Sequence, residues 1–301
     1  MIREERELQQ EIKDLRKREH TRLHEPEKSL SLGAFDNTVD QVSEAQVKSH
    51  GRVSVDGIND SVDTIAHNIH HPIRSPYEEP PSNLEPLFQD AFCSSALSED
   101  SRGLLLDAAI HHIIVQALHS MCFQGKVSTY YLENTHILEY VYEEIAASEP
   151  WSASQRWRSM SASTFMKLLD PSDWDSYVNS ASQQIITTTA WAFEMPVSAF
   201  QSLGRRLEEN IAGVFQSAHE LSVVLKRDIL SARLSVVVGP EPKSQFDSSR
   251  VWPEMKSERQ DRVLGYYGLG LQVERREGEK HFLTLPMVIT ESLTREVKRN
   301  G

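Results

Sequence analysis

Three side chains that can bind a metal ion lie close together in the most apolar stretch of the chain. His112, His119 and Cys122 offer two imidazole nitrogens and one thiolate, which are ligands that zinc prefers. Residues seven and ten positions apart return to one face of an α-helix, so a helix would present the three side chains together. Core side chains show the same spacing, and we expect these residues to be packed or hydrogen-bonded in a core. A metal site is the alternative, and no cofactor is expected.

Two catalytic motifs begin in the sequence and are not completed. His219 and Glu220 open the zinc-protease pattern HExxH, but Val223 stands where the second histidine ligand belongs. Gly125 and Lys126 resemble the end of a phosphate-binding loop, but a valine follows where a serine or threonine would bind magnesium. We therefore predict that the protein is not an enzyme. An active site whose groups meet only in the folded chain stays open as an alternative.

The composition argues against some classes of binding partner. The chain has 301 residues and a net charge of −12, which argues against a broad nucleic-acid or anionic-membrane surface. The basic cluster at 16–18 is interleaved with acidic residues, so its attraction for phosphate would be weak. Cys93 and Cys122 are too few for a disulfide scaffold, and the charged start lacks the apolar core of a signal peptide. We expect an intracellular protein, in the cytoplasm or the nucleus.

The spacing of apolar residues and the local composition divide the chain into three parts. Residues 1–28 are predicted to be a charged helix or short coiled coil, because apolar residues recur at spacings of three and four. Residues 29–83 are rich in Ser, Asp, Asn, Gly and Pro, and we expect a disordered linker. Residues 84–301 are predicted to form one folded domain.

The predicted domain is mainly α-helical. Ser98 is a suitable N-cap for an apolar helix over Gly103–Phe123, whose Asp and His residues argue for a core helix rather than a membrane span. Pro171 starts a helix that is expected to reach Phe193. Further helices are predicted over 84–92, over 128–147 and from about 200 to the prolines at 240 and 242.

The most regular spacing of apolar residues lies in the last of these helices. Apolar side chains recur there on the two seam positions of a heptad. Such a face can mediate self-association or partner binding, and it can equally be a seam inside one domain, because bundles and coiled coils share this spacing. The candidate interface residues are Phe200, Leu207, Ile211, Val214, Leu221 and Leu225, together with Leu8, Ile12 and Leu15 of the N-terminal helix.

Near the C-terminus apolar and polar residues alternate along the chain. Leu271 and Val273 alternate with polar residues, and Gly278 marks a turn, which predicts a β-hairpin over about 269–286. The expected fold class is mainly α. It is a helical bundle-like domain with a small C-terminal β-hairpin, preceded by a short N-terminal helix and a disordered linker.

The layout resembles a group of uncharacterised fungal proteins. The resemblance is carried by the charged coil, the Pro/Ser linker, the helical block with Trp151 and Trp157, the segment Val251–Glu254 and the Gly-Leu-Gly-Leu run from Gly268. It implies one folded domain, and it implies no activity, cofactor or site.

Two functions from different classes are therefore predicted. The leading hypothesis is a non-enzymatic interaction or scaffold protein that associates with itself or with a protein partner through its helices. The alternative is a regulatory or transcription-associated protein that contacts DNA through the basic N-terminal helix.

Overall fold

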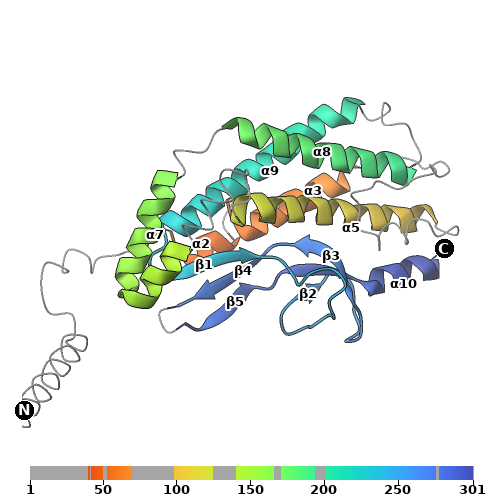
Figure 1. Ribbon diagram of the computed structural model, residues 1–301. Helices are drawn as coiled ribbons and strands as arrows, with labels where there is room; N and C mark the ends of the chain where they lie inside the picture. The colour runs from red at the N-terminus through yellow and green to blue at the C-terminus, as the bar shows by residue number, and fades with distance from the viewer. Residues whose placement is uncertain are drawn as a thin grey trace, which may run out of the picture. The chain divides into compact units, whose positions relative to one another are not determined.

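The computed structural model describes residues 40, 42–49, 53–69, 98–124, 140–165, 171–193, 201–275 and 278–300. They all belong to one compact unit, Val39–Gly301, in which α3, α5, α8 and α9 lie on one side of the strands (Figure 1). In chain order the elements are α2 (Glu44–Ser49), α3 (Val55–His67), α5 (Glu99–Leu118), the π-helical turn η2 (His119–Phe123), helical residues 140–148, α7 (Trp151–Phe165), α8 (Pro171–Phe193), α9 (Gln201–Arg227), β1 (Arg233–Val237), β2 (Trp252–Pro253), β3 (Val263–Gly268), β4 (Gly270–Glu274), β5 (Lys280–Thr284), β6 (Met287–Thr290) and α10 (Glu291–Asn300).

Helix α5 is the element around which the others pack. Leu105 and Ile110 are both fully buried, although five residues turn an α-helix by about 140° and place them on different sides. The surrounding elements are α3, α8, α10 and β3. The Ser98 side chain accepts a hydrogen bond from the backbone N–H of Ser101, which confirms the predicted N-cap.

Within the described residues one helix, Asp100–Phe123, is long and apolar enough to cross a membrane by length and composition. Most of it, 67% of its apolar window, is buried inside the fold. Its apolar side chains are thus covered by the protein's own elements, as the core-helix prediction requires.

The predicted disordered linker over 29–83 is wrong for its middle part. There α3 is a regular helix that begins at Ser54, whose side chain accepts the backbone N–H of Gly57. The polar composition favoured a linker, but apolar residues recur every three or four positions, enough to bury one face against α5 and α9. The buried side chains are Val55, Ile58, Val62, Ile65 and Ala66.

Two other predicted helices are confirmed where the structure describes them. Helix α8 runs over Pro171–Phe193 as expected. Residues 140–148 are helical and agree with the end of the helix predicted over 128–147. The helices predicted over 1–28 and 84–92 lie outside the described residues.

Helix α9 carries the predicted heptad, and the fold itself covers that face. Its apolar residues belong to the core that α9 shares with α3 and α8. The period therefore marks a seam inside the domain, and a partner interface on this face is not supported. The residues concerned are Leu207, Ile211, Val214, Leu221 and Leu225, each 5% exposed or less. The other candidates, Phe200, Leu8, Ile12 and Leu15, lie outside the described residues.

Helix α9 ends at Arg227, well before the prolines at which the sequence predicts its end. The carboxylate of Asp40 accepts the backbone N–H groups of residues 230 and 231. Arg158 of α7 donates to two carbonyl oxygens in the same turn. Side chains that are distant in the sequence therefore fix the end of α9. The local spacing of apolar residues does not reveal them.

The strands form two three-stranded sheets, with the orders β1-β4-β5 and β2-β6-β3. The predicted hairpin is confirmed, because β4 and β5 are antiparallel neighbours and Gly278 adopts a positive φ of 75° in the connection. The sequence does not predict β1, β2 or β3. β1 comes after a long segment whose apolar spacing indicates a helix, and β3 contains glycines that favour turns.

Gly270 provides a test of the close approach between β4 and the chain after β5. A Cβ atom at Gly270 would lie 2.5 Å from the backbone nitrogen of Pro286. We expect Gly270→Ala to lower the free energy of unfolding by roughly 1–3 kcal/mol, because the backbone must move. Gly213→Ala is the control, since its Cβ would meet nothing within 4 Å on α9, and it should raise that free energy by roughly 0.5–1 kcal/mol. Urea unfolding measures both, and an unchanged midpoint for Gly270→Ala would contradict the packing described.

Candidate functional site

The metal-ligand candidates are not brought together. In the described part of the chain no group of three or more His, Cys, Asp and Glu side chains could hold a metal ion. The helix changes from α to π at His119, so Cys122 no longer follows the α-helical spacing from His112. Burial also raises the pKa of the Cys122 thiol and disfavours the thiolate that binds metals. His112 instead uses Nδ1 to accept the backbone N–H of Tyr266 at 3.2 Å.

The next residue, His111, joins three elements. Its Nε2 lies 2.7 Å from the carboxylate of Asp63 on α3, and its Nδ1 lies 2.9 Å from the backbone oxygen of Asp107 on α5. Both partners are acceptors, so this geometry favours the doubly protonated ring, in which both nitrogens donate. The ring stacks on Tyr267 of β3 with centroids 3.9 Å apart. The Tyr267 hydroxyl in turn donates to the Asp107 carboxylate at 3.3 Å.

The two adjacent histidines titrate in opposite directions. Burial opposes the charged form of His111, but the hydrogen bond to Asp63 and the charge of Asp107 outweigh it and raise the pKa of His111. Burial lowers the pKa of His112 to about 4, so this ring is neutral. Burial and the charge of Asp107 raise the pKa of the nearby Glu254.

The geometry gives this His111 cluster, made of His111, Asp63, Asp107 and Tyr267, a structural role. Both nitrogens of His111 lie within hydrogen-bonding distance of protein oxygens, so neither is placed to take a proton from a substrate. The bonds tie α3 and β3 to α5. Sequence reasoning missed the cluster because Asp63 falls in the segment predicted to be disordered.

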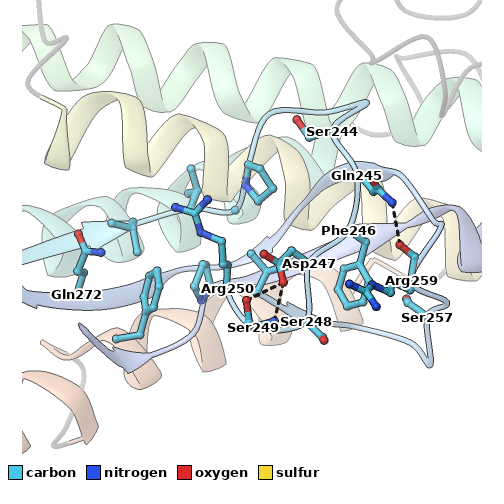
Figure 2. A pocket seen from close by; sticks show the side chains of 17 residues that line it. Ser244, Gln245, Phe246, Asp247, Ser248, Ser249, Arg250, Ser257, Arg259 and Gln272 are labelled. Atoms are coloured by element: carbon cyan, nitrogen blue, oxygen red, sulfur yellow. Dashed lines mark hydrogen bonds between the residues drawn. The ribbon is translucent and has the colours of Figure 1, made fainter. Parts of the chain in front are cut away.

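A second feature is a groove of about 1200 Å³ on the outer face of the β1-β4-β5 sheet (Figure 2). Gln272 and Phe282 stand opposite each other on β4 and β5 and line it, while Leu271 and Val273 are buried on the helix side. The loop that follows β1 forms the other wall. The described lining residues are Val237, Val238, Gly239, Pro240, Ser244, Gln245, Phe246, Asp247, Ser248, Ser249, Arg250, Val251, Ser257, Arg259, Gln272, Phe282 and Pro286.

The wall formed by residues 239–251 is fixed to the start of β3. The backbone N–H of Phe246 donates to the carbonyl oxygen of Asp261 at 2.8 Å, and the N–H of Val263 donates to that of Ser244 at 2.8 Å. The Phe246 side chain is buried in a small apolar cluster of its own. The wall is therefore anchored by both backbone pairing and packing.

An ion pair between the buried Asp261 and the half-exposed Arg295 supports the same region. The Asp261 side chain is 1% exposed and receives two hydrogen bonds from Arg295 of α10, at 2.6 and 2.8 Å. It also accepts the backbone N–H of Glu258 at 2.8 Å. These contacts lower the pKa of Asp261, with the Arg295 hydrogen bonds acting most strongly. The turn at 258–261 thus has a fixed position beside the groove.

The charged groups of the groove come from two loops. The Asp247 carboxylate accepts the N–H and the hydroxyl of Ser249 at 3.0 and 2.7 Å. These bonds lower the pKa of Asp247, with smaller contributions from the charges of Arg250 and Arg259. Neither guanidinium group makes a hydrogen bond or an ion pair with another residue of the described chain.

Sequence reasoning also missed the groove. Its residues come from a strand end, a long loop, a turn and a hairpin, and none of these segments carries a motif. The nearest signal in the sequence is the alternation on β4, which places Gln272 on the face opposite Leu271. That alternation predicts an exposed face and gives no indication of a cavity.

The two adjacent histidines predict opposite effects of pH on stability. The folded pKa of His111 lies above the unfolded value of about 6.5, so its contribution is complete below about pH 6.5 and is lost as the pH rises through the folded pKa. The folded pKa of His112 is about 4, so stability falls as the pH drops from about 6.5 towards 4.

Two variants separate these effects in urea unfolding between about pH 4.5 and pH 9. His111→Gln keeps a donor for Asp63 but does not titrate, and it should remove the loss of stability on the alkaline side. His112→Asn keeps an acceptor for the N–H of Tyr266, and it should remove the loss on the acid side. A His111→Gln profile parallel to that of the unsubstituted protein would show that His111 is not charged in the fold.

Known proteins give no assignment for either feature. No protein-family model, no curated protein and no solved structure matches the chain. The resemblance to fungal proteins therefore stays a prediction, and the function has to be argued from the groove itself.

Proposed function

We propose that the chain is a non-enzymatic binding domain that holds an extended segment of a protein partner in the groove. The observation that carries this proposal is the groove itself, which is half-open, has a volume of about 1200 Å³ and has a mixed apolar and polar lining. Small-molecule pockets are typically about 300–1,000 Å³ and enclose most of their ligand. An open trough of larger volume fits an extended polypeptide better.

The neighbouring strand supports a polypeptide occupant. β5 stands at the end of the order β1-β4-β5, so it is an edge strand of its sheet. The backbone groups of an edge strand lie in the plane of the sheet, so they can pair with a part of the segment that continues from the groove past this edge. Phe282 of β5 lines the groove and is half-buried, so it provides an aromatic anchor of the kind that dominates binding energy.

The described lining groups favour binding over catalysis. Asp247 is occupied by Ser249, and its lowered pKa makes it a weak base. The Ser257 hydroxyl donates to the carbonyl oxygen of Met255 at 2.9 Å and lies 2.5 Å from the hydroxyl of Thr290. Neither arrangement provides the adjacent base that activates a nucleophile. The proposal keeps the interaction class predicted from the sequence and moves the interface from the α9 face to the groove.

Display of random dodecapeptides against the full chain tests the proposal. We expect enriched peptides that bind in solution, measured by fluorescence anisotropy. Phe282→Glu should weaken their binding at least about tenfold, because the loss of about 1.4 kcal/mol from one aromatic contact has that effect. Met160→Glu is the control, since Met160 is 61% exposed on α7 and does not line the groove.

Gln272→Trp is a second variant, which fills the groove without adding charge. Thermal unfolding shows that each variant is folded before its binding is measured. Two results would overturn the proposal: no peptide binds the full chain, or the enriched peptides bind both groove variants as tightly as the unsubstituted protein.

A further inference from the structure

We infer that the groove selects acidic segments, in which Asp or Glu side chains of the partner bind to Arg250 and Arg259. The inference rests on the proposed function and specifies its substrate class. The shape of the groove does not determine the charge of the segment that binds there, whereas the charged side chains of its lining do.

Both guanidinium groups are available for binding. Arg250 follows the turn that begins at Asp247, and Arg259 lies in the turn at 258–261; Figure 2 shows both among the groove side chains. Both residues are exposed, and within the described chain neither guanidinium has a hydrogen-bonding or ion-pair partner. Arginine binds carboxylates with two parallel N–H donors, so two unpaired guanidinium groups form a ready site for carboxylates.

The two arginines act on the same region of the groove. The charges of both contribute to the lowered pKa of Asp247, so both lie within electrostatic reach of that carboxylate. Asp247 directs one oxygen to Ser249 instead of forming an ion pair with either arginine. Among the charged residues that line the described groove there are therefore two positive groups and one negative group.

The charge of the groove lining differs in sign from the net charge of the chain. The net charge is −12, so most of the protein repels an acidic partner. Charges are screened beyond about 8–10 Å at physiological ionic strength, and an acidic segment that enters the groove is affected mainly by the local arginines. A basic segment would meet two like charges there.

The same geometry favours carboxylates over phosphate. A phosphate group carries nearly two negative charges at neutral pH, and Asp247 would oppose it more strongly than it opposes a single carboxylate. The amide groups of Gln245 and Gln272 lie at other points of the lining and provide further neutral donors. Singly charged side chains spread along an extended segment match this arrangement.

Four fluorescent dodecapeptides with the same alternating valine positions test the inference on the full chain. Their other positions are Glu, Gln, Lys or phosphoserine. We expect the Glu peptide to bind at least about tenfold more tightly than the Gln peptide and to weaken as salt is raised from about 0.05 to 0.3 M. Arg250→Gln and Arg259→Gln should each weaken its binding roughly three- to tenfold. Arg205→Gln on the exposed side of α9 is the matched control and should change nothing.

The outcomes separate the inference from the proposed function. Equal binding of the Glu and Gln peptides, with no effect of either groove arginine, would overturn the selection for acidic segments and leave the peptide groove intact. Tighter binding of the phosphoserine peptide than of the Glu peptide would overturn the choice of carboxylate. If none of these peptides binds and display also enriches none, the proposed function itself fails.

Discussion

The fold depends on covering most of the surface of α5. Its buried side chains Leu105, Ile110, Ile114 and Leu118 are fully removed from water, which requires neighbours around most of the helix. Helices α3, α8 and α10 and strand β3 provide that cover. The elements come from both ends of the described chain, so the packing of one helix joins segments that are more than a hundred residues apart.

The interior polar groups follow from the same constraint. A helix that is apolar around most of its circumference still carries His111 and His112, and each must be satisfied where it is buried. His111 meets this need as a charged ring between Asp63 and Asp107, whereas His112 meets it as a neutral acceptor for Tyr266. Two adjacent residues of one type thus favour different protonation states, because the atoms that face them differ.

Sequence patterns predict the elements whose signals are local. Ser98 before an apolar run predicts the start of α5, Pro171 predicts the start of α8, and the alternation around Leu271 predicts the hairpin. Helix α3 carried an equally local signal in its apolar spacing, and the polar composition around it outweighed that signal. The end of α9 was not predictable in this way, since Asp40 and Arg158 fix it from distant positions.

The groove lies beyond local prediction for a related reason, and the same fact supports its use for binding. Its wall is held by pairing with β3, by the buried Phe246 and by the contact of Asp261 with Arg295. No short window of sequence contains these partners together. Because the protein's own contacts already order the wall, an occupant does not have to order it, and less of the binding energy is lost to conformational entropy. On this ground we propose that the pre-formed trough, whose two guanidinium groups have no hydrogen-bonding or ion-pair partner in the described chain, holds a flexible segment whose own ordering is the main entropic cost.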